Sequence, residues 1–81
     1  MLMTEPEVSP RVAAEIVEDL SRPGVPQPLR LTEGETKALR LIADGLTYSD
    51  VARRLYVSET TIDNHARNTQ QKAQMFRDWP A

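Results

Sequence analysis

The 81-residue sequence contains no cysteine, only three glycines and a single histidine. Without cysteine there is no disulfide framework and no thiolate chemistry, and His65 alone cannot make a zinc site. Three scattered glycines cannot form a phosphate-cradling loop, and neither a nucleophile–base pair nor a carboxylate dyad is recognisable. The sequence therefore predicts no enzyme, no metal site, no cofactor and no small-molecule substrate.

Long hydrophobic runs are also missing. No apolar stretch approaches the roughly 20 residues that cross a bilayer, and the acidic start MLMTEPE does not resemble a signal peptide. We therefore expect a soluble cytoplasmic protein without a membrane partner. Aromatic residues make up 5% of the chain against 40% for all hydrophobic residues, so the core must be aliphatic. Because the apolar residues do not alternate as in strands, we predict an all-α fold, a small helical bundle.

Charge of neither sign dominates, since the formal net charge is −2. Residues 1–27 hold five acidic and two basic side chains, whereas residues 28–81 hold seven acidic and eight basic ones. The acidity therefore belongs to the front of the chain. The remainder offers only a weak electrostatic attraction for nucleic acid.

Composition and capping signals divide the chain into segments. Ser9 can cap a helix with Pro10 at its first position, where the missing N–H costs nothing. Three prolines and a glycine then interrupt helical periodicity. The predicted segments are a flexible N-terminus (1–8), an N-terminal linker helix (9–21), a Pro/Gly linker (22–29), a helix-turn-helix domain (30–74) and a divergent C-terminal tail (75–81).

Three further helices are expected after the linker. Thr32 and Glu35 have the spacing of a capping box, and Gly45 supplies the left-handed turn that ends this helix. Thr47 caps a helix over roughly 48 to 55, and Ser58 caps the next one after a tight turn. Helical spacing directs one set of side chains of this last helix inward: Ile62, Ala66, Thr69 and Ala73.

Two short helices joined by a tight turn, the second with a polar outer face, are typical of a helix-turn-helix. The major groove of DNA admits one α-helix, with its N-terminal half foremost. Small hydroxyl residues at that end can bond phosphate oxygens, while amide and guanidinium groups can reach base edges. The candidate DNA-binding residues are Ser58, Thr60, Thr61, Asp63, Asn64, Arg67 and Asn68.

The stretch LTEGETKALRLIADGLTYSDVARRLYVSETTIDNHARN resembles the C-terminal DNA-binding domain of the LuxR/FixJ/NarL family of bacterial response regulators. The family pattern LT-x-x-E-x-x-x-L-x-x-I-A-x-G is present. The later IA-x-x-L-x-[IV]-S-x-x-TV-x-x-H is also followed without a gap, with Val51 and Ile62 at its first and later aliphatic positions. The resemblance implies a four-helix output domain whose third helix enters the major groove. By position, Ser58, Thr60 and Thr61 would hold phosphates, and Asp63, Asn64 and Arg67 would contact bases.

The resemblance also implies a dimer, since the fourth helix of the family is its usual dimer contact. Here QMFRDWPA stands in place of that helix, so we expect it to be truncated or replaced. We expect Met75, Phe76 and Trp79 to cover a thinned core. Asp63, where the family often has lysine, would repel phosphate.

Two functions follow from these observations. The first is a sequence-specific DNA-binding transcriptional regulator that acts on double-stranded DNA as a homodimer or as a heterodimer with a related regulator. The alternative is a protein-interaction module, an adapter or antagonist, that pairs with a related regulator and binds DNA weakly or not at all. Asp63 and the acidic first helix favour this alternative.

Overall fold

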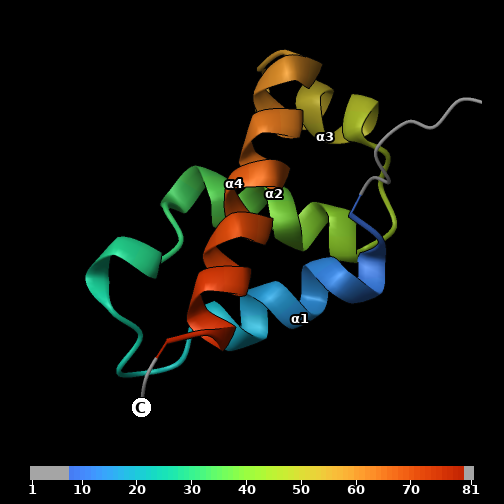
Figure 1. The fold of residues 1–81 in the computed structure, drawn as a ribbon. Helices are drawn as coiled ribbons and strands as arrows, with labels where there is room; N and C mark the ends of the chain where they lie inside the picture. Colours follow the sequence, from blue (N-terminus) through green and yellow to red (C-terminus); the bar gives the residue numbers. More distant parts are fainter. Residues whose placement is uncertain (1–7, 80–81) are drawn as a thin grey trace, which may run out of the picture.

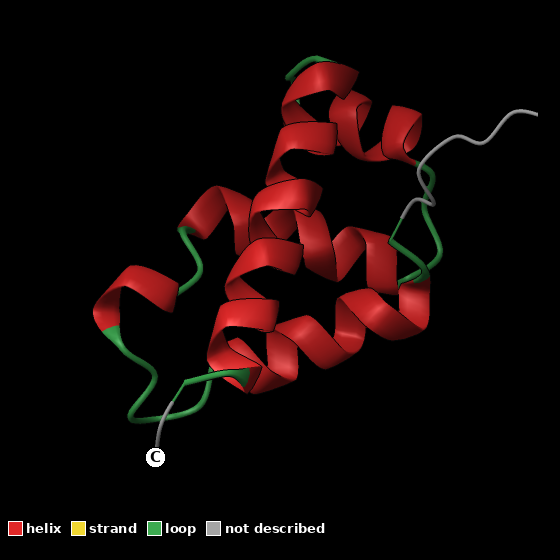
Figure 2. Ribbon diagram, viewed as in Figure 1, coloured by secondary structure: helices red, strands yellow, loops and turns green. Residues whose placement is uncertain are grey.

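The computed structural model describes residues 8–79, and all regular elements within them are helical. In chain order they are α1 (Pro10–Leu20), the short 3₁₀ helix η1 (Gln27–Leu29), α2 (Glu33–Ala43), α3 (Tyr48–Leu55) and α4 (Glu59–Arg77) (Figure 1). Loops alone connect these helices (Figure 2). The predicted all-α class is confirmed. Residues 1–7 of the expected flexible N-terminus, and residues 80–81 of the tail, lie outside the described residues.

Side-chain caps fix where the first three α-helices begin. The Ser9 hydroxyl accepts a hydrogen bond from the Val12 N–H at 3.2 Å, and the Thr47 hydroxyl accepts one from the Asp50 N–H at 3.1 Å. Thr32 and Glu35 form both hydrogen bonds of the capping box. At the other end of α2, Gly45 has a φ of +101°, the left-handed conformation that glycine adopts without strain.

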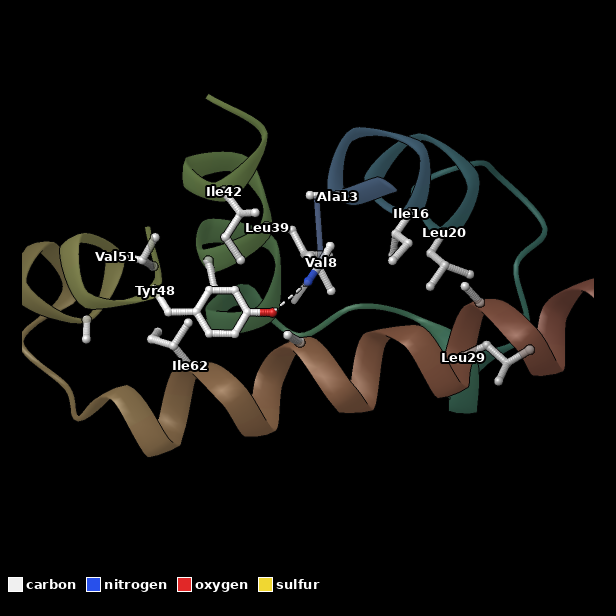
Figure 3. Packing of buried hydrophobic residues seen from close by; sticks show 14 of the residues in the cluster. Val8, Ala13, Ile16, Leu20, Leu29, Leu39, Ile42, Tyr48, Val51 and Ile62 are labelled. Carbon is white, nitrogen blue, oxygen red and sulfur yellow. Dashed lines mark hydrogen bonds between the residues drawn. The ribbon is translucent and has the colours of Figure 1, made fainter. Parts of the chain in front are cut away.

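The helices enclose one aliphatic core. α2 lies between α1 and α3, and α4 runs across all three (Figures 1 and 3). The largest fully buried side chains come from η1, α2, α3 and α4: Leu29, Leu39, Ile42, Ile62, Val51 and Thr69. α1 contributes Ala13, Ile16 and Leu20 to the same core, so its apolar stripe packs on the domain itself. A chain of this size buries only about 60% of its unfolded surface, which makes each of these contributions significant.

The segments before α2 are more tightly packed than their sequence suggests. Val8 belongs to the stretch expected to be flexible, yet its side chain is buried and its N–H donates to the Tyr48 hydroxyl at 3.0 Å (Figure 3). Val25 and Leu29 are buried within the proline-rich stretch expected to be a linker. Prolines exclude a long helix but do not prevent apolar neighbours from gaining burial free energy.

The tail also differs from expectation. α4 continues without a break to Arg77, so residues 75–77 belong to this helix rather than to a separate tail. Of the three side chains expected to cover the core, only Phe76 packs against it. Met75 and Trp79 are 53% and 47% exposed. Helical geometry explains the exposure of Met75, which follows Ala73 by two positions and so points away from the buried edge, whereas Trp79 lies beyond the end of α4.

One ion pair ties α4 to the start of α2. The Lys72 ammonium donates to the Glu35 carboxylate at 2.7 Å and to the Arg30 carbonyl oxygen at 2.9 Å. Burial alone would raise the pKa of Glu35, but the hydrogen bonds from Lys72 and from the Thr32 backbone outweigh it and lower this pKa. Glu35 thus stays charged in a buried site because both of these partners compensate its desolvation.

We predict that Lys72→Met lowers the free energy of unfolding by about 1–3 kcal/mol at neutral pH, because it leaves the buried Glu35 carboxylate without its cation. A carboxyl whose pKa is lowered by folding stabilises the fold above its unfolded pKa, and this stabilisation is lost as the pH falls through the folded value. The difference between the two proteins should therefore shrink in acid. Urea unfolding at several pH values measures it.

The control for this experiment is Lys37→Met. Lys37 pairs with Glu33 at 3.6 Å on the surface, where the two side chains are 61% and 84% exposed. Such pairs contribute well under about 1 kcal/mol. An equal loss of stability for both variants would show that burial of the Glu35–Lys72 pair has no special effect.

Candidate DNA-binding surface

A three-residue connection joins α3 to α4. Tyr56 has φ 57° and ψ 43°, and the Val57 N–H returns to the Ala52 carbonyl at 3.0 Å, which closes α3. A non-glycine residue in this left-handed conformation costs roughly 1–2 kcal/mol. The Tyr56 side chain is nevertheless almost completely exposed, at 95%. The tight turn expected before Ser58 is the sequence signal for this residue, because helices commonly end with a residue in the left-handed conformation.

Ser58 caps α4 as predicted. Its hydroxyl accepts a hydrogen bond from the Thr61 N–H at 3.1 Å and lies 3.0 Å from the Thr61 hydroxyl. Both hydroxyls are therefore engaged with each other at the start of the helix. The N–H groups of the first turn carry the positive end of the helix dipole, which favours an anion such as phosphate nearby.

The two faces of α4 are distributed largely as its periodicity predicts. The inward set is buried, and the Thr69 hydroxyl donates to the Ala66 carbonyl at 2.8 Å, so its polar atom is satisfied inside the core. Of the candidate DNA-binding residues, five are exposed and the other two, Thr61 and Asp63, are half-buried. The exposed candidates are Ser58, Thr60, Asn64, Arg67 and Asn68.

Asp63 and Arg67 are joined by an ion pair on this surface. The Arg67 Nε lies 3.1 Å from an Asp63 carboxylate oxygen, one helical turn away. The opposite charges at positions i and i+4 were a sequence signal for this pair. The carboxylate neutralises part of the guanidinium's charge and limits its rotation, so Arg67 is held against the outer face of α4.

His65 has a packing role. A Cβ atom built on Gly34 would lie 3.4 Å from the His65 Nε2, so the ring rests against the first turn of α2. This contact adds to the packing of α4 against α2. Residues 8–79 contain no cluster of three side chains suited to a metal ion.

The geometry defines a helix-turn-helix domain with a polar outer face on its second helix. The family model for bacterial regulatory proteins of the luxR family matches residues 29–75, more than half of the chain. The protein belongs to this family, and at the family level it is a DNA-binding transcription regulator. No curated protein and no solved structure matches it significantly. Among residues 8–79, none of the helices has the length and apolar character needed to span a membrane.

We predict that Ser58→Ala lowers the free energy of unfolding by about 1 kcal/mol, because the Thr61 N–H loses its capping partner. Thr60→Ala is the matched control, because Thr60 is an exposed residue two positions after Ser58, and it should change stability by less than about 0.5 kcal/mol. Thermal unfolding followed by circular dichroism compares the two. Equal stability of Ser58→Ala and wild type would show that the cap contributes nothing.

Proposed function

We propose that this protein is a sequence-specific regulator that reads the major groove of double-stranded DNA with α4. The observation that carries the proposal is the exposed side of α4, where Asn64, Arg67 and Asn68 lie in the N-terminal half of the helix that Ser58 caps. Among residues 8–79 these three side chains are exposed, which supports their access to a duplex.

The chemistry of these side chains suits the groove. Asparagine amides can pair with adenine through two hydrogen bonds, and an arginine guanidinium can pair with guanine in the same manner. The hydroxyls of Ser58, Thr60 and Thr61 lie at the end of α4 that approaches the phosphates, where they would fix the register of the helix. In this arrangement Asn64, Arg67 and Asn68 specify sequence and the hydroxyls position the domain.

Asp63 lowers the positive charge of this surface. Its ion pair with Arg67 reduces the attraction of α4 for any phosphate backbone, so sequence-independent binding is weakened more than base recognition. The Asp63 carboxylate can also accept a hydrogen bond from the amine of a cytosine. A nearly neutral domain can thus gain discrimination at the expense of overall affinity.

The proposal includes a dimer. Two copies of the chain, or one copy with a related regulator, would present two α4 helices to half-sites about 34 Å apart along the duplex. The partly exposed Val12, Met75 and Trp79 are apolar side chains that a second chain could cover. Sedimentation with and without DNA determines the stoichiometry.

Binding to fluorescent duplex DNA tests the central claim. We expect binding at low salt that weakens linearly on a plot of log affinity against log salt, with a slope of about −0.9 for each phosphate neutralised. No binding at low salt would contradict the proposal. If the chain then formed mixed complexes with a related regulator, the protein-interaction alternative would be supported instead.

We predict that Arg67→Ala weakens binding to a duplex selected by the wild-type protein by about 1–3 kcal/mol and reduces its preference over unrelated DNA. The matched control is Arg40→Ala, because Arg40 is an exposed arginine that lies beside Ala14 and Val17 of α1. This control should bind like wild type. Equal losses for both variants would indicate a general charge effect and remove Arg67 from base recognition.

A further inference from the structure

Tyr56 occupies a position where the backbone favours glycine. Its left-handed φ and ψ are adopted freely by glycine and are unusual for a bulky residue. The ring is 95% exposed, so packing inside the domain does not compensate for the strain. The left-handed backbone closes α3, but the exposed ring gains no packing within the fold, which points to a function of this side chain outside it.

The location of Tyr56 indicates which kind of function this is. It directly follows α3, whose last turn carries the exposed Arg53 and Arg54, and it precedes Ser58, the cap of α4, by two residues. The junction of α3 and α4 lies at one extremity of the molecule, and the C-terminal end of α4 lies at the opposite one (Figure 1). Tyr56 therefore shares its end of the domain with the N-terminus of α4.

We propose that Tyr56 is a positioning contact to the DNA backbone, in which its phenolic hydroxyl donates a hydrogen bond to a phosphate oxygen at the edge of the groove that α4 enters. This inference rests on the proposed function. Tyrosine hydroxyls are among the groups that bind backbone phosphates. The tight turn fixes the position of the Tyr56 backbone, and rotation about two side-chain torsions then directs the hydroxyl.

The phenol differs from the arginines nearby because it carries no charge at neutral pH. A neutral contact displaces no counterion, so its loss should not change the salt dependence of binding. A phosphate contact also carries no sequence information, so its loss should weaken binding to every duplex by the same factor. These two properties distinguish Tyr56 from a base-reading residue such as Arg67.

Tyr56→Phe removes only the hydroxyl and tests the contact directly. We expect about tenfold weaker binding both to a duplex selected from a random pool by the wild-type protein and to an unrelated duplex, with an unchanged salt slope. Ser21→Ala is the control, since it also removes an exposed hydroxyl and Ser21 lies at the C-terminal cap of α1, outside α3 and α4. Its affinity should equal that of wild type.

A second variant, Tyr56→Gly, tests the strain. We expect its melting temperature to rise by a few degrees while its DNA affinity falls, because glycine relieves the backbone and removes the contact. Wild-type affinity for Tyr56→Phe, or a lowered melting temperature for Tyr56→Gly, would overturn the inference. Failure of the wild-type protein to bind any duplex would instead refute the proposed function itself.

Discussion

Four side chains of α4 are buried, and only Ile62 among them is large, while Phe76 packs against the core from a partly buried position. Ala66, Thr69 and Ala73 complete a narrow buried edge, and the Thr69 hydroxyl can enter the core only because it donates to the Ala66 carbonyl. Small side chains bury little apolar area, so this edge by itself gives α4 modest stabilisation. The domain must therefore hold its longest helix by other means as well.

The further contacts are an ion pair with α2 and the packing of the elements that precede α2. Lys72 links the second half of α4 to Glu35 in the first turn of α2 and to the Arg30 carbonyl at the end of η1. Leu20 and Leu29 fill the core from elements that precede α2. The narrow edge has a benefit, because it leaves most of the circumference of α4 in solvent. Because only a narrow edge of α4 is buried, the helix is weakly attached and its polar face is exposed to solvent.

Local signals in the sequence were sufficient to predict most of the elements. The caps at Ser9, Thr32, Thr47 and Ser58 act within three residues, and the buried edge of α4 follows from helical spacing, so both could be inferred without coordinates. The exposed face of α4 follows from the same spacing, and the residues proposed to read DNA on it remain a prediction.

Contacts between distant residues could not be inferred in this way. Val8 meets Tyr48 across 40 positions, and Lys72 meets Glu35 across 37. Neither pairing has a local pattern, because each depends on how the helices are assembled. The proline-rich stretch was predicted to be a linker for the same reason. Proline restricts the local backbone, but it does not indicate whether the neighbouring Val25 is buried in the core. Phe76 likewise packs against the core from the last turn of α4, a contact for which the sequence has no local pattern.

The burial of α1 and its neighbours has a practical meaning for anyone who excises the family-matched region. That region begins at residue 29, yet Val8, Ala13, Ile16, Leu20 and Val25 all precede it and are buried. They are five of the fifteen buried hydrophobic residues in the described part of the chain. A fragment trimmed to the shared region would uncover the flanks of α2 and α4 that these residues occupy. The cooperative folding unit is thus longer than the segment that defines the family.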